Sequence, residues 1–360
     1  MEKRAKTLAA SCALAIWWLA LPPAQAQNEN LEGTIQRLSQ DAAREYVAPI
    51  SSALGANLNG GWFHRAPDPK ILGFNLEVGV VGMASFFPRK STHFLTSGQF
   101  IFSLSEAEHL VQAVTDPQIR AEALQILTTT PSTVRIEGAT VVGKPDDYIT
   151  LDFGGGTYQT SRGRVTLPPN RVVLPIAGFG KLAEVDFLPL AAPQLTIGTI
   201  LGTQATFRYF PAAEVLPELG ELHYFGFGIQ HNPMVWFRSA RLPFNIAAGY
   251  YTQKITFEDL FKVQTTAYGI NLSKRLGFGF LNLTPYAGYM IEDAQMEVNY
   301  DYVVQTPVGE QMHRIRFDLK SENKNRITVG LSLRLLIINL NVDYNFAKYN
   351  SATAGVNFIL

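Results

Sequence analysis

The C-terminal end of the chain alternates between large apolar and small polar residues. Over residues 338–346 every second side chain is apolar, and the side chains between them are Asn339, Asn341, Asp343 and Asn345. A period of two places the two sets on opposite faces of a β-strand. In a soluble sandwich the apolar face would lie in the core, whereas in an outer-membrane barrel it would face lipid and the polar face would line the interior. The remaining sequence has to distinguish the two architectures.

The N-terminus has the three parts of a secretory signal peptide. Basic residues precede an apolar stretch over residues 8–21, and an Ala-Gln-Ala sequence ending at Ala26 provides the small residues of a cleavage site. We therefore expect residues 1–26 to be removed before Gln27. The single cysteine, Cys12, lies in this segment and lacks the context of a lipidation site, so the mature chain has no disulfide and no thiolate metal site.

Composition narrows the class of the mature chain. No stretch after the signal peptide approaches the roughly 18 apolar residues of a membrane-spanning helix, which leaves a soluble periplasmic protein, a secreted protein or a barrel. The 30 basic and 30 acidic residues balance, so nothing points to a nucleic-acid partner. Charged residues make up only 17 % of the chain, below the usual value of about 25 %. A low charge content is typical of a strand-rich protein with one face in lipid.

Two segments have helical rather than strand periodicity. Apolar residues recur at helical spacing over residues 30–53, which predicts an amphipathic helix. This helix either packs on the outside of a domain or belongs to an N-terminal segment, residues 27–55, that plugs or caps a barrel. A second helical pattern over about residues 104–130 has Ser105 as its expected N-cap and is interrupted at Pro117, so it predicts two short helices inserted among the strands.

Most of the remaining sequence predicts strands. We expect strands over residues 57–64 and 72–86, two to four short strands in the irregular region 131–193, and a regular series from Gln194 onward. At least six strands of this series oppose large apolar side chains to Gly, Ala, Ser, Thr and Asn, where a solvated face usually carries Lys, Glu and Arg. Small and amide side chains suit a confined polar interior.

Aromatic residues lie near the predicted strand ends, where the girdle of a barrel meets the lipid interface. These residues are Phe244, Tyr250, Tyr289, Tyr344 and Phe346. Together with the division between the two faces, they favour a membrane barrel over a soluble barrel or sandwich, which remains the alternative.

The connections between the predicted strands differ in length. Short turns near residues 274–276 and 334–336 are expected on the side of the C-terminus, whereas residues 295–319 predict a protruding hairpin that pairs Asp301 with Arg314. The sequence therefore predicts an all-β fold: an antiparallel transmembrane barrel within residues 56–360. We expect about 12 strands, with a range of about 10 to 14 that depends on the irregular region.

Residues with catalytic or metal-binding potential are scattered. None of the six histidines has metal-ligand spacing to another histidine or a thiolate, so we expect no metal and no cofactor. A membrane-embedded lipid-modifying enzyme would need a serine and a histidine, and only Ser239 with His231 or His223 offers such a pair, without an orienting carboxylate. The glycines at 154–156 lack the Lys-Ser/Thr of a phosphate loop and predict a turn or bulge. We expect the chain not to be an enzyme.

The predicted interior of the barrel is the candidate functional surface. The side chains expected to line it are Glu77, Arg208, Arg334, Asn339, Asn341 and Asp343. A charge in this position needs water or a partner. Either these charges form a water-filled or salt-bridged lumen that only holds the barrel together, or they line a selective path for a small solute.

Several segments resemble an uncharacterised family of bacterial outer-membrane barrel proteins. These segments are Leu-Asn-Gly-Gly-Trp-Phe-His-Arg-Ala at 58–66, Leu-Gly-Phe-Asn at 72–75, and the stretches 192–211, 226–232 and 351–358. The resemblance implies a barrel fold and brings no activity with it. A helical segment ahead of a barrel is also similar in plan to the hydrophobic-compound channels of the FadL type, on architecture alone.

The leading hypothesis is a barrel of the Gram-negative cell outer membrane that acts as a plugged channel for small or hydrophobic solutes. A structural or adhesive surface barrel is the alternative, and a lipid-modifying enzyme is the third. The expected partners are outer-membrane lipid, the barrel-assembly machinery and a small-molecule solute. The alternating stripe that ends at Leu360 resembles the terminal signal read by that machinery, although a leucine stands where an aromatic residue is usual.

Overall fold

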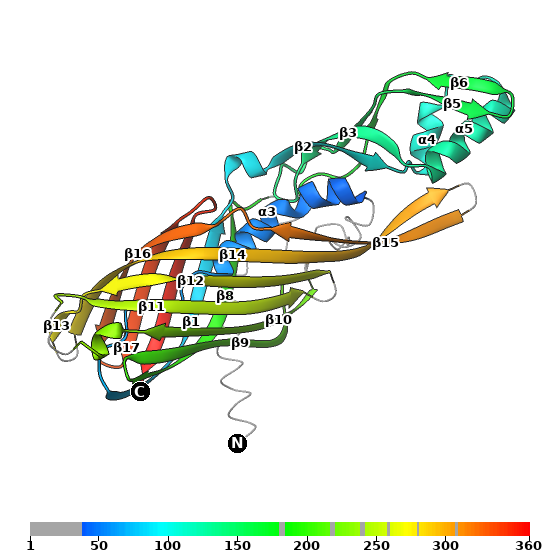
Figure 1. Ribbon diagram of the computed structural model, residues 1–360. Helices are drawn as coiled ribbons and strands as arrows, with labels where there is room; N and C mark the ends of the chain where they lie inside the picture. The colour runs from blue at the N-terminus through cyan, green and yellow to red at the C-terminus, as the bar shows by residue number, and fades with distance from the viewer. Residues whose placement is uncertain are drawn as a thin grey trace.

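A closed barrel of ten antiparallel strands forms the body of the molecule (Figure 1). The computed structural model describes residues 38–179, 184–216, 220–237, 242–257, 260–278, 281–306 and 309–360. Each barrel strand pairs with two neighbours, and β12 pairs with β14 to close the sheet. In order around the barrel the strands are β1 (Leu72–Phe86), β18 (Ser351–Ile359), β17 (Ile338–Phe346), β16 (Asn325–Leu335), β14 (Leu281–Thr306), β12 (Phe261–Ser273), β11 (Asn245–Phe257), β10 (Gly220–His231), β9 (Thr203–Leu216) and β8 (Phe187–Ile200).

Two further strands belong to the same sheet but lie outside the closed ring. Both β13 (Leu276–Phe278) and β15 (Gly309–Lys320) pair with β14, so the sheet has 12 strands. The predicted number of about 12 strands fits the whole sheet, and ten of these strands form the closed barrel. The predicted hairpin is confirmed, because Asp301 is opposite Arg314 and Oδ1 of Asp301 accepts a 3.0 Å hydrogen bond from Nε of Arg314.

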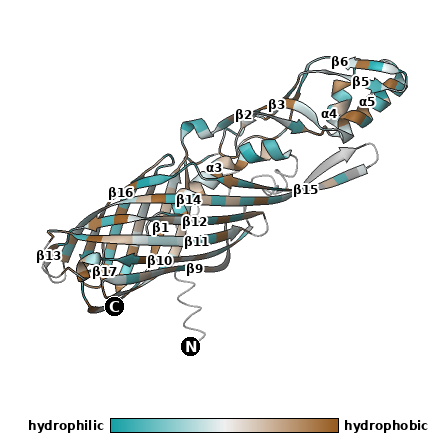
Figure 2. Cartoon of the chain, viewed as in Figure 1, coloured by the Kyte–Doolittle hydropathy of each residue, from teal (hydrophilic) through white to brown (hydrophobic). Residues whose placement is uncertain are grey.

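The two faces of the barrel strands have opposite character. On β17, Leu340 and Val342 are 40 % and 56 % exposed, whereas Asn341 and Asp343 are 8 % and 3 % exposed. Figure 2 shows the apolar and polar residues alternating along the barrel strands. The polar face therefore lines the interior and the apolar face points out, which excludes a sandwich with this stripe in its core.

One set of exposed aromatic side chains lies at the level where β16 begins and β17 ends, and another, which includes Phe74, lies at the other end of the barrel. Tyr250 is opposite Tyr268 on the neighbouring strand, and the ring of Phe86 contacts the rings of Phe187 and Tyr344. Four of the five aromatic residues expected in a girdle lie at this level: Tyr250, Tyr289, Tyr344 and Phe346. The fifth, Phe244, is exposed just before β11 and belongs to the opposite end.

The two ends of the barrel differ. The end that holds the C-terminus, here the turn end, has a tight turn at Leu201-Gly202 and another at 336–337. The other end, here the loop end, carries the β14–β15 hairpin and a long insertion between β1 and β8, residues 87–186, here the arm. None of the helices among the described residues has the length and apolar character to cross a membrane.

The arm has its own small sheet and helices. Its elements are η1 (Arg89–Ser91), β2 (His93–Phe100), α4 (Leu104–Leu110), α5 (Pro117–Thr129), β3 (Ser132–Ala139), β4 (Thr150–Phe153), β5 (Gly156–Thr160), β6 (Gly163–Leu167) and β7 (Asn170–Val173). Strands β2, β3, β4 and β7 form one sheet, and β5 and β6 form a separate hairpin. The short strands of the irregular region up to Val173 therefore do not belong to the barrel. Within that region only β8 is a barrel strand. Gly154 and Gly155 link β4 to β5, with Gly155 at a φ of 82°.

The inserted helices begin at different residues from those expected. The N-cap of α4 is Ser103 rather than Ser105, because Ser103 and Glu106 bond reciprocally in a capping box. The sequence has a second Ser-x-x-Glu pair, Ser105 and Glu108, but Ser105 lies inside the first turn of the helix. Pro117 occupies the first turn of α5, after an Asp116 N-cap.

The expected strand over residues 57–64 is wrong. Asn57 and Leu58 complete the helix α3 (Gln40–Leu58), and the residues that follow run as irregular chain inside the barrel. A segment surrounded by strands on all sides buries polar and apolar side chains alike, so its local alternation does not indicate a strand. The short helix η3 (Pro233–Val235) lies at the turn end between β10 and β11.

Candidate functional site

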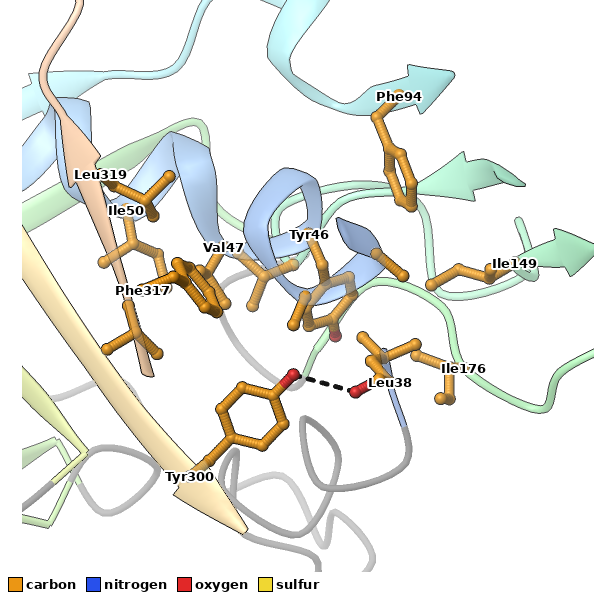
Figure 3. Packing of buried hydrophobic residues seen from close by; sticks show 14 of the residues in the cluster. Leu38, Tyr46, Val47, Ile50, Phe94, Ile149, Ile176, Tyr300, Phe317 and Leu319 are labelled. Atoms are coloured by element: carbon orange, nitrogen blue, oxygen red, sulfur yellow. Dashed lines mark hydrogen bonds between the residues drawn. The ribbon is translucent and has the colours of Figure 1, made fainter. Parts of the chain in front are cut away.

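The N-terminal segment passes through the barrel from one end to the other. We call residues 38–71 the plug: α3 at the loop end, followed by an irregular segment that leads into β1. At the loop end the Tyr300 hydroxyl donates to the Leu38 carbonyl at 2.9 Å (Figure 3). At the turn end the amide of Leu201 donates to the carbonyl of Ile71 at 2.9 Å. The lumen is therefore occupied along its length by the protein's own chain.

Helix α3 packs on the β14–β15 hairpin through apolar contacts. Figure 3 shows Val47 and Ile50 of the helix beside Phe317 and Leu319 of β15, and all four side chains are buried. On its other side the helix meets the arm, where the Tyr46 carbonyl accepts from the Val141 amide at 3.0 Å. The helix is thus fixed by an apolar core that the barrel and the arm share.

Two arginines of the barrel wall hold the C-terminal end of α3. The last carbonyls of a helix lack intrahelical partners and carry partial negative charge, and α3 has no basic residue in its last turn. Nη1 of Arg208, on β9, lies 3.5 Å from the Leu58 carbonyl, and Nη1 of Arg326, on β16, lies 3.4 Å from the Ala56 carbonyl. The wall supplies the cations that the helix itself lacks.

The two arginines differ in their other partners. Arg326 is 2 % exposed and binds the Glu292 carboxylate, with Nε 3.1 Å from Oε2 and Nη2 bonded to the same oxygen. Arg208 is fully buried and has no carboxylate partner in the part of the chain that the structure describes. Its Nε donates to Oε1 of Gln194 at 3.0 Å, and its guanidinium lies 4.0 Å above the ring of Trp62.

An aromatic layer crosses the lumen next to these arginines. The ring of Trp62 stacks on Tyr251 at 5.2 Å, and Phe63 makes an edge contact with Tyr286 at 5.9 Å. Glycines of the wall make room for these rings. A Cβ atom on Gly288 would lie only 2.5 Å from Phe63. The small residues of the inner face are therefore the seat of the plug and not the lining of an empty pore.

Beyond the aromatic layer the plug is held by polar contacts. Glu77 on β1, which is 2 % exposed, bonds to Arg65, and its Oε2 lies 3.3 Å from Nε2 of His64. Asn75 also donates to this carboxylate at 2.9 Å. The carbonyl of Pro67 accepts from Asn232 at 2.7 Å. This part of the plug is joined to the wall by hydrogen bonds and one buried ion-pair cluster.

The six predicted lining residues do not form a single site. Glu77 and Arg208 contact the plug, as described above. Asn339, Asn341 and Asp343 are buried inside the barrel and bond to Ser332, Asn357 and Tyr286, respectively. Arg334 is half-buried at the turn end, where its Nε donates to the Leu336 carbonyl at 3.0 Å.

Sequence reasoning missed five of the residues that matter most. These residues are Trp62, His64, Arg65, Glu292 and Arg326. Glu292 and Arg326 lie at inward positions of strands whose alternation was recognised, so extending that alternation by two residues to Arg326 and by four to Glu292 would have found them. The residues of the plug gave no such signal, because the segment was expected to be a strand.

The candidate chemical sites of the sequence are not assembled in the described residues. Nδ1 of His231 lies 2.9 Å from the Thr203 hydroxyl, and its Nε2 accepts from Trp236. Ser239 lies outside the residues that the structure describes. In the described ranges no three His, Cys, Asp or Glu side chains are grouped so that they could hold a metal.

Comparisons with known proteins identify a family but no activity. No protein with a curated description matches this sequence. The outer membrane protease OmpT of Escherichia coli is 10 % identical with a TM-score of 0.27, over 81 % of this chain and 100 % of that protein. The β domain of the Bordetella autotransporter BrkA is 11 % identical with a TM-score of 0.20, over 78 % of this chain and 98 % of that domain. Similarity to FadL-type channels stays an expectation. The model of a family of unknown function (DUF6588) matches residues 1–360, and the chain belongs to that family.

Proposed function

We propose that this protein is an outer-membrane β-barrel that acts as a channel closed by its own N-terminal plug. The observation that carries the proposal is the occupied lumen: residues 38–71 fill it, and beyond the aromatic layer they are joined to a polar wall by hydrogen bonds and ion pairs. Such contacts can be exchanged for contacts with water. The wall would remain polar, and so wettable, after the plug had moved.

The outer surface supports a membrane location. The nine residues of β17 match the roughly 9–11 that a tilted strand needs to cross a bilayer, and their outward side chains are all apolar. An apolar band of about 25 Å with an aromatic girdle is typical of outer-membrane barrels. In this proposal the turn end faces the periplasm, and the loop end with its arm faces outward.

The lining favours small polar solutes over hydrophobic ones. The part of the lumen nearer the turn end is lined by buried amide side chains, among them Gln204, Gln230, Asn271, Asn339 and Asn341. A hydrophobic solute would have to desolvate these groups without replacing their hydrogen bonds. A polar solute can replace them. We therefore propose that the channel serves polar solutes, and we do not assign a catalytic role to any residue.

The test is single-channel conductance in planar bilayers. The double variant Trp62→Ala/Phe63→Ala removes the aromatic layer and is expected to conduct in long openings, while the unchanged protein stays mostly closed. The matched control is Phe74→Ala/Phe358→Ala, which removes two outward aromatic rings that are 73 % and 47 % exposed. Heat-modifiable gel migration verifies that each variant is folded.

Two results would contradict the proposal. If the folded Trp62→Ala/Phe63→Ala variant conducts no more than the control, the barrel is not a channel. If the protein stays in the soluble periplasmic fraction without detergent, the membrane location is wrong.

A surface-binding role is the second candidate function, because the arm extends away from the barrel at the loop end (Figure 1). A purely structural or adhesive barrel predicts no conductance even when the aromatic layer has been removed. The same bilayer experiment therefore separates the two functions.

A further inference from the structure

Arg208 is a buried charge in the middle of the lumen, and no carboxylate among the described residues pairs with it. Its side chain is 0 % exposed, and Nη2 has no hydrogen-bond partner in the described ranges. Nη1 reaches the Leu58 carbonyl only at 3.5 Å, which is the long limit of a hydrogen bond. A buried arginine normally binds a carboxylate or a phosphate through two parallel hydrogen bonds. Here Nη1 makes two long contacts, to the Leu58 carbonyl and, at 3.8 Å, to Sδ of Met83, and neither terminal nitrogen binds an anionic group among the described residues.

The three buried carboxylates that the structure describes in the barrel are engaged elsewhere. Glu77 binds Arg65 of the plug, and Glu292 binds Arg326. Asp343 accepts from the Tyr286 hydroxyl at 2.9 Å. None of them is left for the guanidinium on β9. An ionised group at membrane depth is costly unless it is paired, and a protein that keeps one is expected to use it.

We infer that Arg208 is the binding residue for a small anionic solute, a carboxylate or a phosphate, in the lumen of the channel. This inference deepens the proposed function and rests on it, because the solute must reach the lumen. Trp62 covers one face of the guanidinium, so the anion binds edge-on to Nη1 and Nη2. At that edge it takes the position of the Leu58 carbonyl.

Anion binding and plug binding therefore compete. The Leu58 carbonyl ends α3 and also accepts from Nε1 of Trp62 at 3.0 Å and from Gln253. An anion that displaces this carbonyl from Arg208 also weakens the seat of Trp62. A ligand that binds one of two states more tightly shifts the population toward that state. The anion accordingly favours the displaced plug, and its arrival opens the channel.

Tryptophan fluorescence can test this directly. Of the four tryptophans, two lie within residues 1–26, so a mature Trp236→Phe protein retains only Trp62. Folded in detergent, it is titrated with sodium acetate and, separately, with sodium phosphate at constant ionic strength. We expect a saturable red shift of the emission with at least one of the two, because Trp62 moves into a wetter environment. The comparison of acetate with phosphate identifies which anion class the site takes.

The variants distinguish a binding role from a merely structural one. Arg208→Gln is expected to abolish the saturable response, and Arg208→Lys, which keeps the charge without the planar fork, to weaken it several-fold. The control Arg171→Gln removes an exposed arginine of the arm and should leave the response unchanged. If Arg208→Gln does not fold, the titrations of the Trp236→Phe protein and of the Lys variant still test whether the anion binds at Arg208.

A response that is absent, or linear without saturation, in the Trp236→Phe protein overturns the inference. A saturable response that persists in the Gln or Lys variant at full strength overturns it as well. Failure of the channel itself gives a different pattern: a saturable response that depends on Arg208, with no conductance in the Trp62→Ala/Phe63→Ala variant. In that case the anion site stands and the proposed function falls.

Discussion

The barrel and the arm use the same strand alternation with opposite results. On β17 the apolar side chains point outward and the amides are buried, whereas on β3 Val134 and Ile136 are buried and Arg135 points into solvent. The ladder of period two is identical in both. The difference shows that alternation defines two faces but not which face is the inside, which depends on what surrounds the sheet.

The helix α3 joins the two regions. Along most of its length the helix packs into an apolar core that includes residues of both the arm and the barrel. Its C-terminal end reaches the polar lumen at Arg208 and Arg326. Ion pairs follow the same division. Those of the lumen are buried, and those of the arm are exposed.

The largest expected effect separates a buried ion pair from an exposed one. Arg326→Leu leaves Glu292 charged, unpaired and 3 % exposed, so we expect a loss of roughly 3–5 kcal/mol in stability. Glu292→Leu/Arg326→Leu removes both charges and should recover most of that loss. Arg171→Leu, which breaks an exposed pair on the arm, should have no measurable effect. Urea unfolding in detergent measures the stability of all three variants. Equal losses for Arg326→Leu and Arg171→Leu would contradict the difference between buried and exposed ion pairs.

The second prediction tests which solvent surrounds each region. Val342→Arg places a charge at the centre of the outer face of β17 and is expected to cost about 2–4 kcal/mol in a bilayer. Leu95→Arg changes an apolar side chain of the arm that is 57 % exposed and should cost close to nothing. Unfolding in lipid vesicles measures both. A neutral Val342→Arg would mean that β17 does not face lipid.

The third prediction concerns the glycine seat of the plug. Gly288→Ala places a Cβ atom 2.5 Å from Phe63, so we expect a loss of about 1–3 kcal/mol from overpacking, together with more frequent channel openings. Gly82→Ala is the matched control, because its nearest neighbour would be 3.8 Å away. Unfolding and bilayer recording check the pair, and equal behaviour of the two variants would show that Phe63 is not tightly seated.

The smallest expected effect is a loosening of the arm tip in acid. Glu122 accepts from the hydroxyl and amide of Ser161, and these bonds lower the pKa of its carboxyl. The pKa of Asp116, the N-cap of α5, is lowered by the amide of Ile119 and by Arg162. A carboxyl with a lowered folded-state pKa contributes stability above its ordinary pKa of about 4 and loses it as the pH falls further.

Hydrogen exchange of the β5–β6 hairpin at pH 6 and at pH 3 measures this effect, which should be absent in the barrel strands. Burial raises the pKa of Glu106, so this carboxyl acts with the opposite sign, and Glu106→Gln serves as the control that removes its contribution. Equal protection of the hairpin at the two pH values would contradict the role assigned to Asp116 and Glu122.

Local patterns were enough to predict most of the barrel strands and which of their faces point inward. The bounds of β1, the inward position of Glu77 and the pairing of Asp301 with Arg314 all follow from parity and turn position, which involve residues near one another in sequence. The helical pattern near residues 104–130 was recognised for the same reason. These features depend on period and capping, which the amino-acid sequence displays directly.

Tertiary structure alone decided which strands close the barrel and what fills it. Ring closure depends on the pairing of β1 with β18 and of β12 with β14, contacts between distant residues that no local period encodes. The plug has no regular period after Leu58 because the wall surrounds it on all sides, so burial no longer selects one face. Arg208 was predicted to point inward from parity, but whether a carboxylate lies beside it depends on every strand of the lumen, and none of the described carboxylates does. Whether two charges pair depends on their distance in space. The sequence by itself determines only which face of a strand carries each charged side chain.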